Sequence, residues 1–388
     1  MSSSPNRRYL PAIDHLRGGA ALLIVFYHGW WLIAPHLLHG RAFDPGKWEE
    51  ASNPLWALLI EGHTAVSLFM VLSGFIFTVG TWGSRIYYWR FMRNRLLRIY
   101  PLFIAITVIA AVADPRNLTL AGVAKTLLLC TNCDGAFGAA PYTSMFWTVA
   151  VEFQFYVLFP LLLVILNRWG LTGLGLVAGA FLVIRLVMLL HGSNMRDLAY
   201  ETLPGRIEQF LLGMVAARIY LTRAAVYRRR LSLWAAPILA AQLCLLFAFN
   251  RVGGGWPTVV WWKLLWPMVE GAGWAGFIVC YTVAAHSARN GIWRGLQALG
   301  TISYSVYLLH FVVVVAVVRA GLFMTLTGDG AIDALITTFV VVVPPVLILS
   351  AISYRLVERP FLDLRKTYVI PAREGLSEHH LQAAGPQV

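Results

Sequence analysis

The chain has 388 residues, of which 59% are hydrophobic and only 13% are charged. A soluble domain carries roughly 25% charged residues, so this composition excludes a soluble protein of the same length. The apolar residues fall in long continuous runs, and a helical span needs roughly 20 apolar residues to cross a membrane. A membrane β-barrel would instead need short alternating segments. The composition therefore predicts an all-α polytopic membrane helix bundle.

The chain is expected to form about ten transmembrane helices. The first apolar run contains Arg17 and has no convincing cleavage site, so it is expected to remain as a span rather than a signal peptide. Residues 1–360 are predicted to form a single transmembrane domain, and residues 361–388 a short polar cytoplasmic tail that is partly disordered. The predicted spans cover about residues 16–36, 55–80, 96–113, 146–166, 171–191, 207–221, 231–249, 257–285, 298–320 and 332–353.

Every second loop between these spans is basic, and Lys and Arg accumulate in cytoplasmic loops. The pattern predicts an even number of spans with both termini in the cytoplasm. It also accounts for the net charge of +13, so anionic lipid headgroups are the expected neighbours and a nucleic-acid partner is not expected. The basic residues are Arg7 and Arg8, then Arg85, Arg90, Arg93, Arg95 and Arg98, then Arg223 and Arg228 to Arg230, then Arg289 and Arg294, and last Arg359, Arg365 and Lys366.

Cysteine is sparse. Cys130 and Cys133 form a CxxC in an outer loop, where they could pair as a local disulfide or remain free thiols. A zinc site would need more ligands than these two. No metal site is predicted.

Charged residues inside the spans are the first functional candidates, because each costs roughly 2.5–3.5 kcal/mol at a helix centre. Arg17 and His28 lie eleven positions apart, which places them on one helical face, roughly 16 Å apart along the axis. In the simpler interpretation, Arg17 reaches lipid headgroups and His28 makes a buried hydrogen bond.

Five polar residues are expected at one depth in the outer half of the membrane, because of the spans on which they lie. A histidine beside a carboxylate at the same depth can act as a base, whereas each residue alone could simply join two helices. The layer therefore predicts a lined cavity. Its members are His28, Glu61, His63, Glu152 and His310.

A second cluster lies on the cytoplasmic side, where Arg95 and Arg98 share one helical face. Arginine forks bind phosphate oxygens in bidentate fashion, although lipid phosphate would satisfy them equally well. The chain has no Walker A or Rossmann glycine pattern, so a nucleoside triphosphate or dinucleotide has no dedicated loop.

Taken in order along the chain, five segments resemble the acyltransferase family 3 membrane proteins, which O-acylate surface saccharides and some other hydroxylated molecules. The resemblance covers nearly the whole chain. The segments are Ile13 to Ala20 with Phe26, Tyr27 and His28; Leu68 to Phe75; Arg95 to Pro101; Phe146 to Tyr156; and Ser303 to His310 together with Glu358, Arg359 and Pro360.

Two features depart from the family. Many relatives carry an acidic residue where this chain has Ser67, and Glu61 is a candidate to compensate for it. Many relatives also carry a C-terminal extracytoplasmic hydrolase-like domain. This chain is expected to lack one, so any such function would need another protein.

The resemblance implies a bacterial inner (plasma) membrane enzyme that moves an acyl group, most commonly acetyl, from cytoplasmic acyl-CoA to a saccharide hydroxyl. Arg17, Arg95 and Arg98 would hold the CoA phosphates. His28 would deprotonate the acceptor or carry the acyl group itself, and Glu152 would orient it or relay protons. Tyr304 and Ser305 could hydrogen-bond the CoA arm or pack between helices.

No permanently bound cofactor is implied. The expected partners are acyl-CoA, the saccharide acceptor, membrane lipids and polysaccharide-assembly proteins. Two rival hypotheses remain at this point: a transporter or flippase that uses the intramembrane charges as a substrate pathway, and a non-catalytic subunit of a polysaccharide-assembly complex. The sequence shows no inverted repeat of the kind many transporters carry.

Overall fold

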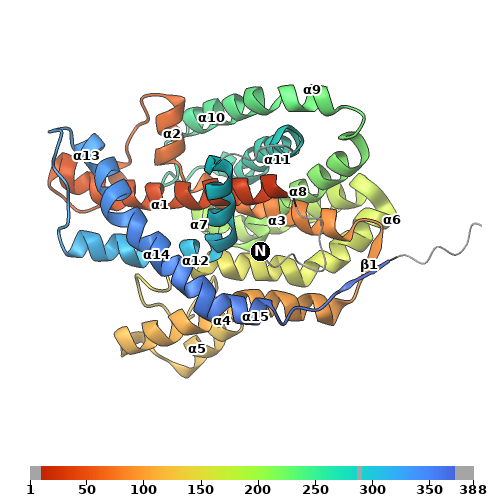
Figure 1. Ribbon diagram of the computed structural model, residues 1–388, viewed down its shortest axis with the longest axis horizontal. Coiled ribbons are helices and arrows are strands. Elements are labelled where there is room, and N and C mark those ends of the chain that lie inside the picture. Colours follow the sequence, from red (N-terminus) through yellow and green to blue (C-terminus); the bar gives the residue numbers. More distant parts are fainter. Residues whose placement is uncertain (1–9, 286–290, 372–388) are drawn as a thin grey trace, which may run out of the picture.

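The computed structural model describes residues 10–285 and 291–371, and helices dominate it (Figure 1). The prediction of an all-α membrane protein is confirmed. The longer helices are α1 (Pro11–His39), α3 (Thr64–Thr81), α4 (Tyr88–Ala113), α6 (Phe146–Leu190), α8 (Leu203–Arg223), α10 (Ala235–Arg251), α11 (Trp266–Ala284), α12 (Gly291–Arg319) and α14 (Val343–Ser353).

Shorter elements connect these helices. Two π-helical segments, Thr338–Val342 and Tyr354–Glu358, precede and follow α14, and single 3₁₀ turns lie at Pro45–Lys47, Pro115–Asn117 and Trp261–Leu264. The other short elements are α2 (Pro54–Ile60), β1 (Ser84–Ile86), α5 (Leu120–Leu127), α7 (Met195–Glu201), α9 (Arg228–Leu233), α13 (Gly330–Thr337), α15 (Arg359–Leu362) and β2 (Val369–Pro371).

Seven helical segments in the described residues are long and apolar enough to cross a membrane. One of them, α6, is interrupted at Gly170, where φ is 62° and ψ is −146°. The interruption divides α6 into the two predicted spans 146–166 and 171–191. The helices α8 and α11 overlap the predicted spans 207–221 and 257–285 but are not among the seven, so the count of ten stays a prediction.

One predicted span, residues 55–80, is not continuous. The structure breaks it into α2 and α3 at a turn over residues 61–63. Gly62 in this turn lies so close to Tyr27 of α1 that an added Cβ would be 2.5 Å from the Tyr27 Cβ. The expectation of one helix is therefore wrong here, because the turn lets the chain approach α1 closely.

The first helix runs through the middle of the molecule (Figure 1), and α12 is its most extensive neighbour. Two glycines allow this approach. A Cβ on Gly18 would collide with the carbonyl oxygen of Leu296, and a Cβ on Gly300 would collide with the backbone of Asp14. Small residues at such crossings are typical of membrane helices, where close backbone contact drives association.

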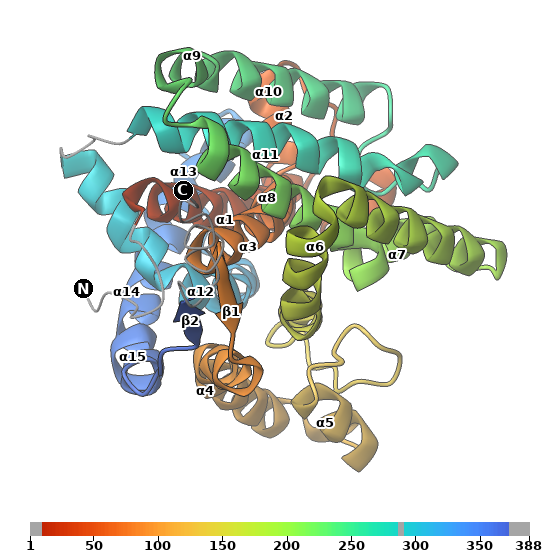
Figure 2. The same cartoon turned by 90° about the vertical axis from the view of Figure 1, so that its right-hand side faces the viewer.

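The remaining helices pack around this pair in layers. The helix α3 packs on α8, α8 on α11, and α10 on α11. In Figure 2, α9 and α10 lie at one side of the molecule, while α4 and α5 lie at the opposite side. The outward faces of α4 and α6 expose large apolar side chains, as expected where lipid rather than water is the neighbour; these include Val108, Ile109, Val112, Leu161, Val164 and Leu176.

The strands β1 and β2 pair antiparallel, with Arg85 opposite Ile370. Nearby, Asn94 donates to the carbonyl oxygen of Lys366 at 2.6 Å and accepts from its N–H at 3.0 Å. This part of the predicted tail therefore packs against β1 and α4, and residues 372–388 lie outside the described residues. The side of the membrane that this end faces stays a prediction.

Candidate active site

A cavity of about 570 Å³ opens between α1, α3, α4, α6 and α12. Its volume falls in the roughly 300–1,000 Å³ range of small-molecule sites. The polar groups that line it are Asp14, Arg17, Ser73, Arg95, Arg98, Thr148, Glu152, Tyr156, Thr301, Ser303, Tyr304, Tyr307, Tyr354 and Arg365. The structure thus brings three predicted phosphate-binding arginines, Arg17, Arg95 and Arg98, to one cavity.

Each of the two α4 arginines is held in place by its neighbours. The Arg95 guanidinium lies 4.8 Å from the ring centroid of Phe77 and 5.7 Å from that of Tyr156. Arg98 donates to the buried Glu358 carboxylate at 2.8 Å, and its guanidinium lies 5.2 Å from the Tyr304 ring. These contacts orient both forks before any ligand arrives.

Tyr304 and Ser305 have different surroundings. Tyr304 lines the cavity, and its hydroxyl donates to the carbonyl oxygen of Ile99 at 2.9 Å. Ser305 is fully buried and donates to Glu358 instead. Glu358 therefore links α12 to Arg98 of α4, a role that the closing motif of the sequence did not reveal.

Glu152 lies in the cavity, where it accepts a hydrogen bond from Ser73 at 2.8 Å. Ser73 is ten residues beyond His63, roughly 15 Å along the axis of α3. The expectation that Glu152 shares a layer with His63 is therefore wrong. The offset arises because the chain turns at residues 61–63 and α3 begins only at Thr64, whereas α6 begins at Phe146, as the predicted span did.

The buried histidines His28 and His310 contact each other directly. The Nε2 atom of His310 lies 2.9 Å from the Nδ1 atom of His28. The Nδ1 atom of His310 lies 3.0 Å from the carbonyl oxygen of Val306, and that of His28 lies 3.2 Å from the carbonyl oxygen of Ile24. A carbonyl only accepts, so the hydrogen-bond pattern assigns a proton to each Nδ1 in the neutral pair. The Nε2 atom of His28 then keeps its lone pair.

This pair lies just beyond the end of the cavity. Tyr307, which lines the cavity, is less than one helical turn from His310, and the two ring centroids are 5.8 Å apart. Phe69 also lines the cavity and packs against Tyr307, with centroids 6.4 Å apart. Tyr307 therefore connects the cavity to His310.

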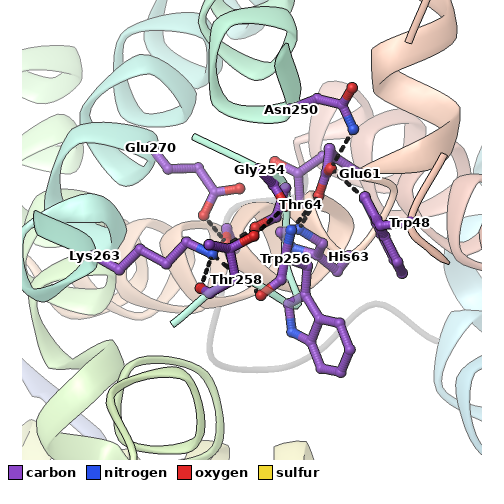
Figure 3. A network of polar contacts seen from close by, with 12 residues as sticks. Trp48, Glu61, His63, Thr64, Asn250, Gly254, Trp256, Thr258, Lys263 and Glu270 are labelled. Atoms are coloured by element: carbon purple, nitrogen blue, oxygen red, sulfur yellow. Dashed lines mark hydrogen bonds and ion pairs between the residues drawn. The ribbon is translucent and has the colours of Figure 1, made fainter. Parts of the chain in front are cut away.

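A third polar cluster surrounds Glu61, which is fully buried (Figure 3). Its carboxylate accepts hydrogen bonds from Trp48 Nε1 at 2.8 Å and from Asn250 Nδ2 at 2.7 Å, and it lies 2.9 Å from His63 Nε2. Among the described residues, the hydrogen-bond partners of Glu61 do not include Ser67, and the expectation that Glu61 compensates for Ser67 stays a prediction. Ser67 instead donates to Glu270 of α11 at 2.6 Å.

Two further buried charges, Arg185 and Glu208, form an ion pair between α6 and α8 that the sequence analysis missed. The signal was available, since both charges lie within or beside predicted spans. Arg206, two residues before Glu208 in α8, donates to Ser67 at 2.9 Å. These contacts fix α8 against α3 and α6.

The cysteine pair has no sign of catalytic tuning. Cys130 and Cys133 are free thiols. Burial raises the pKa of the Cys133 thiol, and the neighbouring Cys130 raises it further. A reactive cysteine needs a lowered pKa. Within residues 10–285 and 291–371, no group of three or more His, Cys, Asp or Glu side chains is arranged to hold a metal ion.

Comparison with known proteins matches residues 10–355 to a family described as an acyltransferase domain. The chain is 27% identical to Nodulation protein 10 of Rhizobium leguminosarum bv. viciae, over 92% of this chain and 94% of the relative. It is 25% identical to Acyltransferase MdmB of Streptomyces mycarofaciens, over 79% of each chain.

A third relative is the putative peptidoglycan O-acetyltransferase YrhL of Bacillus subtilis (strain 168). It is 27% identical over 80% of this chain, and the match spans about half of the relative, 49%. No solved structure is significantly similar to this chain. Because the family match covers nearly the whole length, the chain belongs to acyltransferase family 3, as its motifs indicated.

Proposed function

We propose that the protein is an O-acyltransferase of the bacterial inner membrane that moves an acyl group, most commonly acetyl, from cytoplasmic acyl-CoA to a hydroxyl of an extracytoplasmic or membrane-linked saccharide. One observation carries the proposal. The His28–His310 pair lies directly beyond the end of a cavity that three arginines line. The arrangement suits a phosphate-bearing donor at one end and acid–base chemistry at the other.

The donor half rests on the oriented arginines. Arg95 and Arg98, with Arg17, would hold the phosphates of CoA, because guanidinium forks match phosphate oxygens. The pantetheine arm would extend past Tyr304 toward Tyr307, and the thioester would reach His28 once the Tyr307 ring moves aside. Exclusion of water from such a channel would protect the thioester from hydrolysis.

The chemical half rests on the free lone pair of His28 Nε2. This atom would take the proton of the acceptor hydroxyl as its oxygen attacks the thioester carbon. As the carbon–sulfur bond breaks, the imidazolium would return the proton to the CoA thiolate, so no net proton is consumed. Alternatively, Nε2 would attack the thioester and carry the acyl group before the acceptor takes it. Glu152, held by Ser73 inside the cavity, would position the donor arm.

The relatives support a hydroxylated acceptor. One is named as an acyltransferase and another as a putative peptidoglycan O-acetyltransferase. A saccharide of the cell envelope is therefore the acceptor class we propose, with polysaccharide-assembly proteins as partners that deliver it. The transporter hypothesis is not favoured by membership of this family.

The test is acyl transfer in membranes that carry equal amounts of wild-type protein or His28→Ala, with labelled acetyl-CoA as donor and total saccharide and lipid fractions as acceptors. We expect label in a saccharide fraction with wild type only. Equal labelling by both proteins would mean that His28 is structural. Wild-type membranes that label no saccharide while still binding acetyl-CoA would remove the saccharide from the proposal.

A further inference from the structure

The buried imidazole of His63 carries an unused hydrogen-bonding atom. Its side chain lies at the turn between α2 and α3, and only 7% of the residue is exposed. Its Nε2 atom lies 2.9 Å from the Glu61 carboxylate. Its Nδ1 atom is buried and has no hydrogen-bond partner among the described residues. Buried polar atoms of this kind are rare and call for an explanation.

The surroundings of Glu61 fix the tautomer of His63. The carboxylate accepts from Trp48, Asn250 and the backbone N–H of Trp256, at 2.8, 2.7 and 3.2 Å. A carboxylate with this many donors is an ionised acceptor, so the Nε2 of His63 carries the proton. The unpaired Nδ1 is then a lone pair, and a lone pair can only receive a hydrogen bond.

The loop that completes this arrangement is itself clamped. The buried Lys263 ammonium donates to the carbonyl oxygens of Gly255, Trp256 and Thr258 (Figure 3). These three bonds hold the backbone of Trp256, whose N–H holds Glu61. The orientation of His63 is thus over-determined by the fold, as positioned binding groups require.

A second unpaired polar group lies beside His63. The hydroxyl of Tyr200 on α7 is buried without a partner among the described residues, and only 2% of Tyr200 is exposed. The rings of Tyr200 and His63 meet edge to face, with centroids 5.1 Å apart. Two buried polar atoms without partners therefore belong to side chains whose rings are in contact, and a ligand with several hydroxyls is the chemistry that satisfies both.

This pair of groups lies next to the proposed base. The Tyr27 ring contacts both histidines, at 6.1 Å from His63 and 4.7 Å from His28 between centroids. Trp31 lies 5.6 Å from His28 and 6.1 Å from Trp256. Aromatic faces beside hydroxyl-binding groups suit the apolar face and polar edge of a sugar ring.

A small hollow of about 20 Å³ lies beside this aromatic group. Tyr27, Trp31 and Trp48 line it, and its rim carries four charged residues, Arg41, Asp44, Lys47 and Glu49. Tyr27 lies ten residues beyond Arg17 on α1, so the hollow is roughly 15 Å along the helix axis from Arg17.

We propose that His63 and Tyr200 bind a non-reacting hydroxyl of the saccharide acceptor and so present a neighbouring hydroxyl to His28. Glu61 is the positioning residue that holds the lone pair of His63 toward the acceptor. The inference rests on the proposed acyl transfer and adds the acceptor subsite to it. It also assigns the substrate class as a compound with at least two hydroxyls.

The test separates the acceptor from the donor. His63→Gln, Tyr200→Phe and the exposed control His191→Gln are compared with wild type in membranes at equal insertion. The acceptor is the saccharide fraction that wild-type membranes label, titrated by dilution, and the donor is labelled acetyl-CoA. For both site variants we expect the KM for the saccharide fraction to rise about tenfold, the effect of one lost hydrogen bond, while the KM for acetyl-CoA and CoA binding stay at wild-type values.

Tyr200→Phe is expected to fold like wild type, because it removes only a hydroxyl without a partner among the described residues and keeps the ring. A saccharide KM equal to that of wild type in both variants would overturn the inference and leave the acyltransferase proposal standing. Equal increases in both KM values would assign His63 a structural role and would also overturn it. Wild-type membranes that bind acetyl-CoA but label no saccharide would overturn the proposed function, and this inference with it.

Discussion

The Nε2 atom of His310 lies 2.9 Å from the Nδ1 atom of His28, so one hydrogen bond joins α12 to α1 near the end of the arginine-lined cavity. The two residues are 282 positions apart in the chain. Their contact depends on the close crossing of α1 and α12 that Gly18 and Gly300 permit. His310 can thereby set the tautomer of His28 from the opposite helix.

The first prediction concerns His310→Ala. The variant removes the shorter of the two contacts at His28 Nδ1 and leaves only the carbonyl oxygen of Ile24, at 3.2 Å. The His28 ring is then held less firmly with Nε2 unprotonated, so the rate of acyl transfer should fall by at least about 10²-fold, the lower end of what a positioned base contributes. Acetyl-CoA binding should be unchanged, because His310 lies outside the arginine-lined part of the cavity. Single-turnover transfer and equilibrium binding of labelled acetyl-CoA measure the two quantities.

The double variant His28→Ala/His310→Ala sharpens this test. Residues that act as a unit are not additive, so the double variant should be no slower than His28→Ala alone. If the two losses multiply instead, His310 acts independently of His28.

The second prediction concerns Arg95→Lys. The flat guanidinium of Arg95 lies against the rings of Phe77 and Tyr156, and a lysine would lose both the stacking and the fork. The Kd for acetyl-CoA should rise about tenfold, or ~1.4 kcal/mol. With acetyl-pantetheine, which lacks the CoA phosphates, wild type and variant should transfer equally well. A loss of the same size with both donors would show that Arg95 does not bind phosphate.

The sequence was sufficient for the family and for several cavity residues. Arg17, Arg95 and Arg98 belong to short motifs. A charged side chain within an apolar run is also conspicuous, because its insertion into a membrane is costly in free energy, and such residues are usually functional. The cavity brings these residues together although α1 and α4 are far apart in the chain.

The details that depend on tertiary contacts could not be predicted. The turn at residues 61–63 breaks an apolar run, because Gly62 packs on Tyr27, and hydropathy does not report such a contact. The pairing of Ser67 with Glu270 joins residues 203 positions apart. The depth estimate also failed for His63 relative to Glu152, because α3 begins nine residues after the predicted start of its span, roughly 14 Å along the axis.

The third prediction concerns the buried ion pair of Arg185 and Glu208, in which neither side chain reaches solvent to any extent. Removing one partner leaves a buried charge unpaired, so Arg185→Met should reduce stability by about 3–5 kcal/mol. Replacing both residues, as in Arg185→Met/Glu208→Met, should recover most of that loss. Thermal unfolding in detergent measures all three proteins. A double variant as unstable as the single one would mean that Arg185 acts through packing rather than charge.

The last prediction asks whether the carboxylate that Glu270 of α11 supplies to Ser67 and Arg206 can instead be supplied from position 67 of α3. Ser67 accepts from Arg206 at 2.9 Å and donates to Glu270 at 2.6 Å, so Glu270 is the carboxylate nearest to Ser67 in this buried network. Ser67→Asp would place two carboxylates side by side, and both cannot remain ionised at that separation. The variant should therefore have a lower melting temperature in detergent and reduced acyl transfer.

The compensating variant Ser67→Asp/Glu270→Ser moves the negative charge from α11 to α3 and keeps one carboxylate near Arg206. It should recover the melting temperature and the transfer rate toward wild type, whereas Glu270→Ser alone should not, because it leaves Arg206 buried without a nearby opposite charge. Recovery in the double variant would show that the site requires one carboxylate and accepts it from either helix. A double variant no better than Ser67→Asp would mean that the position of Glu270 on α11, rather than its charge, is what the network requires.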